Sequence, residues 1–321
     1  MNPDSGTSRE FMFKPRQFLG PPLVVAPRRA GHVQAAVQFI IPGLTVGEKQ
    51  KDAVRRLLDR LGREVWSAPL KRVASPDGKE VGTIVAIAFH VPQAATPEAL
   101  IASIDDAAIA IVERFLGMLS FLAGLRLAAL HTQTTHIQEG GSMSTCLHPL
   151  GRAGETRTPL HFPEDPFGGR TPTNNIFISL FWLRRALAER DPLDTYAAVM
   201  VSLQAIAREV VQLKPAERRC SKCGHLTPED PGVSAMVREL LVGKLGATPD
   251  QFAQLWKTRN AVVAHGNQPV DAGTFLRATE LKFEAVDLCY KGVKLAMGLP
   301  LDGPPRPDQS FFVTSALMYV E

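Results

Sequence analysis

The chain has 321 residues, 45% of them hydrophobic and 21% charged, which is ordinary for a globular protein and sufficient for two domains. Its net charge of +4 comes without a dense Lys/Arg block, so the charge permits nucleic-acid contact but does not argue for it. Four cysteines in so long a chain do not suggest a disulfide framework, and no basic-then-apolar leader opens the sequence. We therefore do not expect secretion, and the expected location is the cytoplasm.

Residues 1–30 have weak periodicity and are expected to form a flexible or extended arm. Residues 31–137 combine short apolar runs with helical patterns, which predicts a small sheet with helices on it, an α+β domain. The expected helix at 48–61 has a basic side that could touch phosphates, although a solvated face is the preferred interpretation. The expected elements are a strand at 32–41, a helix at 48–61, a hairpin of strands 71–74 and 81–91, and a helix from 97 to about 129.

The last of these helices contains the most hydrophobic window of the chain, residues 107–125. Glu113 and Arg114 lie in its middle, so the window predicts a buried helix and no membrane span. His131 and His136 follow it at a spacing that does not place both on one helical face, and they are interpreted as ordinary polar residues near a helix end.

Residues 138–174 are rich in Gly, Pro, Thr and Arg and contain few helix formers. A structureless loop of this length inside one domain would be unusual, so we expect an interdomain linker or a large surface insertion. Its histidines, His148 and His161, are interpreted as plain loop residues.

From residue 175 to 298 apolar positions recur at helical spacing, which predicts an antiparallel helical bundle. Cys289 lies in the apolar stripe of the last helix and is expected in the core. Residues 299–321 are expected to be a Pro-rich linker and an apolar tail that docks back, as a strand on the first domain's sheet. The expected helices are 176–189, 194–213, 233–245, 251–265 and 272–297.

The fourth helix of this bundle has clear signals at both ends. Thr248 can cap its start, and Pro249 suits its first position. Gly266 supplies the left-handed residue that ends many helices. The polar residues that interrupt its last apolar turns are Arg259, Asn260 and His265.

This Arg-Asn followed by His-Gly resembles the signature of the HEPN superfamily (higher eukaryotes and prokaryotes nucleotide-binding domains). Trp256-Lys257 before the motif and Gly266 after it look like the branch called Apea-like HEPN. The resemblance covers about Asn174 to Met297 and implies a HEPN-like helical bundle. It further implies a homodimer with a composite, metal-independent endoribonuclease site, of the toxin or bacterial defence type, acting on RNA.

The resemblance also implies a role for each residue of the motif. His265 would serve as general base or acid at the ribose 2′-hydroxyl or the leaving oxygen. Arg259 would hold the scissile phosphate, and Asn260 would orient the phosphate or the histidine. No cofactor would be required for catalysis, and an antitoxin or regulatory protein would be a further partner.

Helix geometry separates Arg259 from His265. Six residues turn the direction by about 600°, so the two side chains point about 120° apart on an uninterrupted helix. Either the helix distorts or ends before His265, or two copies of the motif face each other across a dimer. The competing interpretation is a helix C-terminus where His265 interacts with the last carbonyls and Arg259 is solvated.

The sequence Cys-Ser-Lys-Cys-Gly at 220–224, between the second and third bundle helices, has the shape of a zinc knuckle. Cys220 and Cys223 would supply two of the four ligands, and a bound zinc ion would be structural. Unligated thiols and a redox dithiol remain alternatives. The candidates for completing the site are His225, the pair Cys146 and His148, and the same cysteines of a second subunit.

A second class of function remains open: a non-catalytic HEPN adaptor, or a nucleotide- or partner-binding module, with a structural zinc knuckle. In that case the α+β domain would sense a ligand or partner. An enzyme needs Arg259 and His265 of both subunits at one solvent-reachable cleft, whereas an adaptor has no such requirement.

Overall fold

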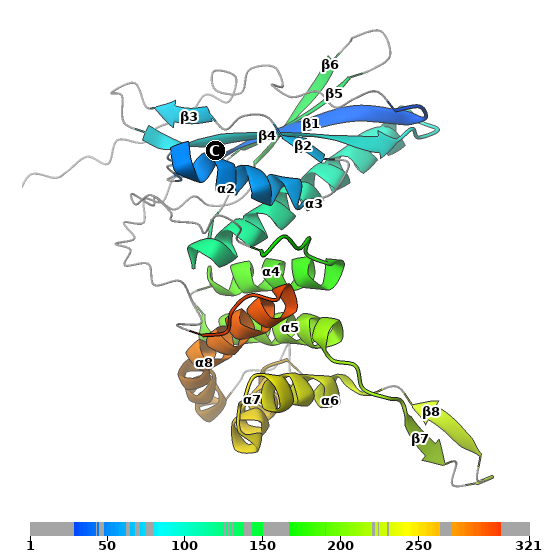
Figure 1. The fold of residues 1–321 in the computed structure, drawn as a ribbon, viewed down its shortest axis with the longest axis vertical. Helices are drawn as coiled ribbons and strands as arrows, with labels where there is room; N and C mark the ends of the chain where they lie inside the picture. The colour runs from blue at the N-terminus through cyan, green and yellow to red at the C-terminus, as the bar shows by residue number, and fades with distance from the viewer. Residues whose placement is uncertain are drawn as a thin grey trace, which may run out of the picture. The chain divides into compact units, whose positions relative to one another are not determined.

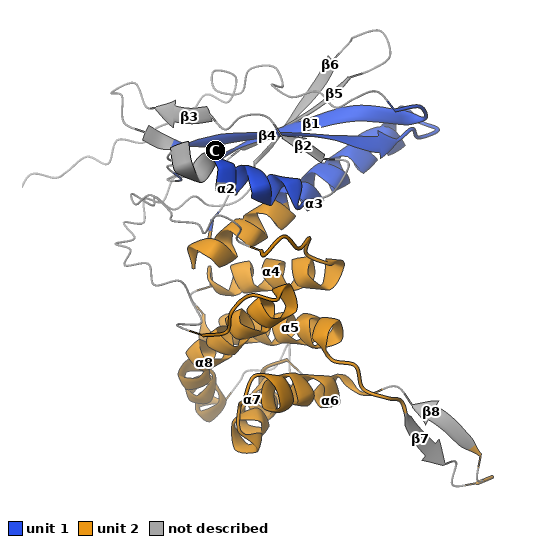
Figure 2. Cartoon of the chain, in the orientation of Figure 1, with its two compact units in different colours: residues 1–112, 127–164, 310–321 blue, residues 113–126, 165–309 orange. Residues whose placement is uncertain are grey.

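The computed structural model describes residues 29–42, 44, 48–61, 65–67, 71–74, 80–124, 126–127, 129, 131–137, 143–149, 167–189, 191–219, 222–223, 225–229, 231–263 and 271–302. The chain divides into two compact units (Figure 2). Unit 1 comprises Met1–Val112, Leu127–Glu164 and Ser310–Glu321, and unit 2 comprises Glu113–Arg126 and Asp165–Gln309. Together, the sheet and the helices make the chain α+β, as predicted.

Unit 1 is built on an antiparallel sheet. Its elements are β1 (His32–Pro42), α2 (Glu48–Asp59), β2 (Val65–Ser67), β3 (Lys71–Ala74), β4 (Glu80–Pro92), β5 (His131–Ile137) and β6 (Met143–Pro149). The strand order is β2-β4-β1-β5-β6, and β3 pairs with another part of β4. The predicted hairpin of β3 and β4 is therefore confirmed.

One face of this sheet is strongly apolar. Val37, Phe39 and Ile41 alternate along β1 and have no exposed surface, nor has Ile87 opposite Val37 on β4. Helix α2 and the first part of α3 (Pro97–Ala123) lie on the same side of the sheet (Figure 1). The predicted apolar side of α2 is buried, which confirms the helical pattern of that segment.

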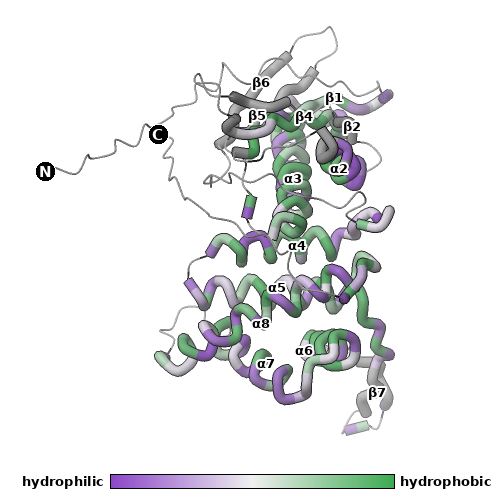
Figure 3. Tube along the Cα trace, turned by 60° about the vertical axis from the view of Figure 1, so that its left-hand side comes forward, coloured by the Kyte–Doolittle hydropathy of each residue, from purple (hydrophilic) through white to green (hydrophobic). Residues whose placement is uncertain are grey.

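Helix α3 is hydrophobic along much of its length (Figure 3). Phe115, Leu116 and Leu119 are completely buried, so the predicted buried helix is confirmed for the middle of the window 107–125, although Ile109 near its start is 40% exposed. Within the described residues, no helix combines the length and the apolar character that a membrane crossing requires.

Three expectations for the region after α3 are wrong. The helix does not continue to Ala129, because Gly124 adopts a left-handed conformation (φ 69°) directly after Ala123. His131 and His136 belong to strand β5, which pairs with β1, and the stretch 138–174 contains strand β6. Threonine, a β-branched residue, is frequent in β5 and suits a strand. The predicted loop is incorrect for Met143–Pro149, because these residues pair with β5.

Unit 2 is largely helical, and all five helices predicted for it are present. They are α4 (Asn174–Ala186), α5 (Pro192–Val210), α6 (Val233–Arg238) with the π-helical turn η1 (Glu239–Lys244), α7 (Pro249–Val263) and α8 (Ala272–Met297). A hairpin of β7 (Ala216–Arg219) and β8 (Leu226–Glu229) lies between α5 and α6. Helix α5 is central, because it contacts α4, α6, α7 and α8.

Local signals define the ends of these helices. Asp191 accepts the backbone N–H groups of Leu193 and Asp194 and caps α5, and Asp271 caps α8 in the same way. Gly298 ends α8 in a left-handed conformation (φ 67°). A Cβ atom there would also lie 2.7 Å from the Arg170 guanidinium, so glycine suits this position for two reasons.

A small polar cluster lies inside the helical core. The Ser202 hydroxyl lies 2.7 Å from the Ser179 hydroxyl and 2.9 Å from the Cys289 thiol, which joins α5 to α4 and α8. Burial raises the pKa of Cys289 to about 12, against the opposing effect of these hydroxyl contacts. The thiol therefore stays protonated at neutral pH, and Cys289 is a core residue as predicted.

Candidate functional site

Helix α7 carries the predicted motif, and its first residues determine where it begins. The Thr248 N–H donates to Gln251 Oε1 (2.7 Å), and the Gln251 N–H donates to Thr248 Oγ1 (3.1 Å). This reciprocal pair is a capping box, and Pro249 occupies the first helical position, which confirms the predicted start. Gln251 Nε2 also donates to Glu284 Oε1 on α8 (2.9 Å), so the start of α7 is tied to its neighbour.

A buried tyrosine anchors the middle of α7. Tyr196 of α5 has no exposed surface and donates its hydroxyl to the backbone carbonyl of Leu255 at 2.6 Å. In an α-helix that carbonyl also accepts the N–H of Arg259, four residues later. Burial, and secondarily the negative charge of Glu284, raises the pKa of Tyr196, so its hydroxyl remains a donor at neutral pH. The anchor therefore positions the backbone that leads into the motif.

A row of side chains runs along α7 to the motif. The rings of Phe252 and Trp256 stack with centroids 6.0 Å apart and planes 20° apart. The guanidinium carbon of Arg259 lies 5.1 Å from the Trp256 ring centroid, a cation–π contact. Arg259 Nη1 donates to Asn260 Oδ1 at 3.1 Å. The structure thus brings Arg259 and Asn260 together and restrains the arginine on two sides.

Arg259 keeps hydrogen-bonding capacity in this arrangement. The residue is half-buried, and its Nε is buried without a hydrogen-bond partner among the described residues. A guanidinium presents five N–H donors in a planar fork, and the Asn260 contact uses one. A buried donor without a partner costs about 1–3 kcal/mol, so an acceptor supplied by a ligand or a second chain would stabilise this group.

The third residue of the motif, His265, lies outside the described residues, as does Gly266. Helix α7 is described as far as Val263, which confirms the predicted helix up to that residue. The position of His265 relative to Arg259 therefore remains a prediction.

The predicted zinc knuckle follows the end of the β7–β8 ladder. The last register pair is Arg219 with Leu226, so residues 220–225 connect the two strands. Cys223 and His225 are exposed, whereas Cys220 lies outside the described residues. Over the described ranges, no group of three or more His, Cys, Asp or Glu side chains is placed to hold a metal ion.

The proposed completions of the zinc site also remain predictions. Cys146 and His148 are on β6, not in a loop, and they belong to unit 1, while the cysteine pair belongs to unit 2. Completion by a second subunit requires a second chain. The strands on either side of residues 220–225 form a two-stranded hairpin, a structure that is at best marginally stable alone.

Sequence reasoning missed two residues that position the motif. Gln251 had a recognisable signal, because Thr-x-x-Gln is the signature of a capping box. Tyr196 had none, because it lies in the apolar stripe of α5 and its contact with Leu255 spans 59 residues of sequence.

Comparisons with known proteins add no relatives. No protein family matches the chain, and neither a curated protein nor a solved structure matches it. The HEPN resemblance therefore depends on the motif residues and the helical pattern alone.

Proposed function

We propose that the protein is a homodimeric, metal-independent endoribonuclease of the HEPN type, with α4 to α8 as the HEPN-like bundle. Its site would combine Arg259, Asn260 and His265 of two copies. The observation that carries this proposal is the arginine–asparagine pair on α7, joined by a hydrogen bond and held against Trp256.

The pair suits the binding of a phosphate diester. Arginine is always charged, and its planar fork matches the geometry of two phosphate oxygens. Trp256 and Asn260 restrict the rotamers of Arg259 before any ligand arrives, so less conformational entropy is lost on binding. Asn260 is exposed, and its amide N–H groups are donors that could orient the same phosphate.

His265 would supply the proton transfer. Histidine titrates near neutral pH, so it can act as base toward the 2′-hydroxyl and as acid toward the leaving oxygen. The negative charge that develops on the phosphate would be stabilised by Arg259. General acid–base chemistry and arginine together provide a complete set of groups for cleavage without a metal ion.

Exposed apolar side chains support a second copy as partner. Bundle helices normally turn such side chains inward, yet four large ones remain exposed on the neighbouring helices α7 and α8. They are Val263 (36%), Phe275 (43%), Leu276 (58%) and Phe283 (57%). Aromatic and aliphatic side chains of this kind form the centres of dimer interfaces. A two-fold axis beside these two helices would bury these side chains on both chains and bring two motifs toward each other.

Two further parts of the proposal accompany the catalytic site. A zinc ion at Cys220 and Cys223 would be structural, stabilising the β7–β8 hairpin. An antitoxin or regulatory protein would be a partner of a nuclease of the toxin or defence type.

Replacement of the motif arginine tests the proposal directly. Arg259→Ala should weaken binding to a mixed single-stranded RNA pool about tenfold or more, because a charged hydrogen bond contributes about 1.5–3 kcal/mol. It should also slow cleavage. Lys257→Ala is a matched control. It removes an exposed positive charge from the same helix, at a position about 200° around the helix axis from Arg259.

Equal effects of the two variants would show a non-specific electrostatic contribution and would refute the proposed role of Arg259. If the wild-type dimer cleaves no RNA and Arg259→Ala binds RNA as tightly as wild type, the adaptor function should replace the nuclease. Binding would be measured by fluorescence anisotropy, and cleavage by gel electrophoresis of labelled RNA.

A further inference from the structure

Helices α7 and α8 contact each other, and one hydrogen bond fixes their register (Figure 1). The bond joins Gln251, at the start of α7, to Glu284, in the middle of α8, at 2.9 Å. Because the connection from Val263 to Ala272 joins the end of α7 to the start of α8, α8 returns along α7 as in an αα-hairpin. Residues that lie equally far from this bond along the two helices are therefore at the same level.

Arg277 of α8 lies at the level of the motif. Thr258 follows Gln251 by seven residues, and Arg277 precedes Glu284 by seven. Seven residues turn a helix by about 700°, or about 20° short of two full turns, so each residue points in nearly the direction of the one that makes the bond. Thr258 and Arg277 therefore lie on the facing sides of the two helices, about 10 Å along from the bond. Arg259 follows Thr258 directly, so each of the two helices contributes an arginine at this level.

The exposed side chain of Arg277 retains hydrogen-bonding capacity. Its Nη2 donates to Thr274 Oγ1 at 3.3 Å, which is its one hydrogen bond within the described residues. Asp271 also attracts Arg277, but this carboxylate accepts the backbone N–H and the hydroxyl of Thr274, at 3.0 and 2.6 Å, and caps the helix. A guanidinium has five N–H donors, so the contact with Thr274 leaves four for a ligand.

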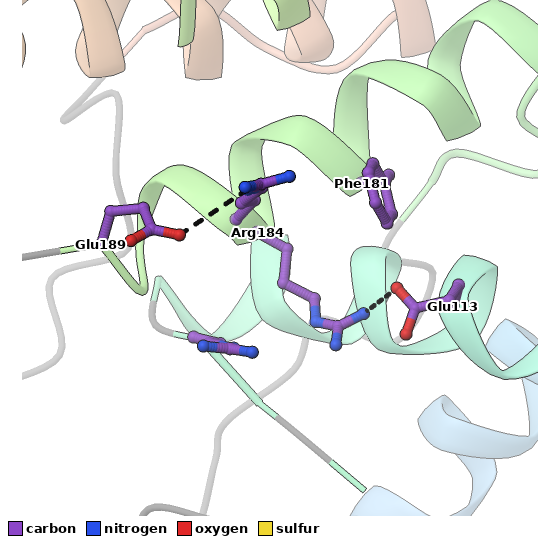
Figure 4. A pocket seen from close by; sticks show the side chains of 6 residues that line it. Glu113, Phe181, Arg184 and Glu189 are labelled. Carbon is purple, nitrogen blue, oxygen red and sulfur yellow. Dashed lines mark hydrogen bonds and ion pairs between the residues drawn. The ribbon is translucent and has the colours of Figure 1, made fainter. Parts of the chain in front are cut away.

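Two arginines that line the pocket beside α4 differ in this respect (Figure 4). Arg184 pairs with Glu113, and both side chains are largely buried. Arg185 contacts both Glu189 and the Trp182 ring. Both positive charges are therefore engaged within unit 2, which makes Arg185 a suitable control arginine.

Two arginines on adjacent helices suit two phosphates of one strand. Helices that pack together have axes about 8–10 Å apart, so guanidinium groups on the facing sides can reach neighbouring phosphates. Each guanidinium can bind one phosphate through two parallel N–H···O bonds. Phosphate contacts of this kind fix the register and orientation of a nucleic acid on a protein. A contact at Arg277 would therefore determine how a strand crosses Arg259.

We propose that Arg277 binds the phosphate adjacent to the one held by Arg259, so that the site takes an RNA strand with at least two phosphodiesters. This inference rests on the proposed function, in which Arg259 holds the scissile phosphate. It adds a substrate-binding residue of α8 to a motif that begins on α7. Arg277 thereby helps to select which phosphate of the strand is cleaved.

Binding of a short, labelled 2′-O-methyl oligouridylate to the full-length protein tests this inference without cleavage, because the attacking hydroxyl is methylated. Arg277→Ala should weaken binding about tenfold or more, as expected for the loss of a charged hydrogen bond. The slope of log affinity against log salt concentration should fall in magnitude by about 0.7, the value for one phosphate contact to a single strand. Arg277→Lys keeps the charge, so it should restore the slope but only part of the affinity. Fluorescence anisotropy measures these affinities.

A 2′-O-methyl dinucleotide separates the contributions of the two arginines, because it contains a single phosphodiester. Its affinity, measured by isothermal titration calorimetry, should be lowered by Arg259→Ala and unchanged by Arg277→Ala. Equal losses in the two variants would place both arginines on one phosphate and would overturn the inference.

Two control variants remove a positive charge elsewhere in unit 2. Arg185→Ala removes a 56% exposed arginine from α4, and Lys282→Ala removes a lysine from α8 about 140° around the helix axis from Arg277. Both should bind the oligonucleotide like wild type, and losses as large as that of Arg277→Ala would show non-specific attraction and overturn the inference. An Arg277→Ala variant that binds like wild type, while Arg259→Ala is weakened, would overturn the inference alone. A wild type that binds no oligonucleotide would overturn the proposed function and this inference with it.

Discussion

Tyr196→Phe tests the anchor that positions the motif. The substitution removes the hydroxyl that donates to the Leu255 carbonyl at 2.6 Å and leaves the ring in place. The carbonyl keeps its helical donor, the N–H of Arg259, so no buried acceptor loses its only partner. The expected loss in the free energy of unfolding is therefore that of one net hydrogen bond, about 1 kcal/mol at pH 8.

The same variant changes the dependence of stability on pH. Burial raises the pKa of Tyr196 above the value of about 10 that tyrosine has in an unfolded chain. Below about pH 10 both states are protonated, and the stabilisation by Tyr196 is fully present. Above that pH the unfolded state ionises first, and the wild type loses about 1.4 kcal/mol per pH unit until the folded-state pKa is reached. The variant lacks this loss, so the free energies of unfolding of wild type and variant should become equal at about pH 11.

Urea denaturation between pH 8 and pH 11.5 measures this effect. Tryptophan fluorescence is a suitable signal, because Trp182 and Trp256 both lie in unit 2. All other groups titrate alike in both proteins, so their contribution drops out of the difference between the two free energies of unfolding. A difference that does not change with pH, or equal stabilities at pH 8, would refute the assignment of Tyr196 as a buried donor.

Three other predictions concern the helix start, the hairpin and the dimer. Thr248→Ala removes one half of the capping box and should lower the free energy of unfolding by about 1 kcal/mol in urea; an unchanged midpoint would contradict the cap. Metal analysis of the wild type should find zinc that disappears in a Cys220→Ser/Cys223→Ser variant, whereas a zinc-free wild type of undiminished thermal stability would end that hypothesis. Leu276→Asp with Phe283→Asp places charge at two exposed apolar positions of α8 and should give a monomer in analytical ultracentrifugation; a persistent dimer would locate the interface elsewhere.

Short-range signals explain what could be predicted from the sequence. Thr248-Pro249 marks the start of α7, and helical periodicity identified the helices from α4 to α8 within a few residues. These features depend on residues within one or two turns of each other, which a sequence displays directly. The hairpin of β3 and β4 was likewise visible, because its turn signal lies between the two strands.

Features that depend on distant residues could not be predicted. Strand β5 is short and polar, and it pairs with β1. The paired residues Gln34 and Ile137 are more than a hundred residues apart in the sequence, so no local pattern indicates the strand. The end of α3 was missed for a different reason, because the left-handed conformation of Gly124 outweighed the apolar pattern that continues beyond it.

In the candidate site, too, the residues could be predicted from the sequence, whereas their contacts could not. The sequence identified Arg259 and Asn260, but not that their side chains would be joined. Helix geometry places consecutive residues about 100° apart, and the contact depends on the arginine rotamer that Trp256 restrains.

The rate of RNA cleavage by the purified protein, with and without His265, tests the proposed function most directly. We predict that the wild type cleaves RNA in the presence of a chelator that leaves the β7–β8 hairpin folded. His265→Ala should be slower by about 10²–10⁴-fold, because it removes the group that transfers the proton, while its unfolding free energy stays close to that of the wild type. Equal rates for the two proteins, or a wild type that cleaves only when a divalent metal is added, would contradict a metal-independent site built on His265.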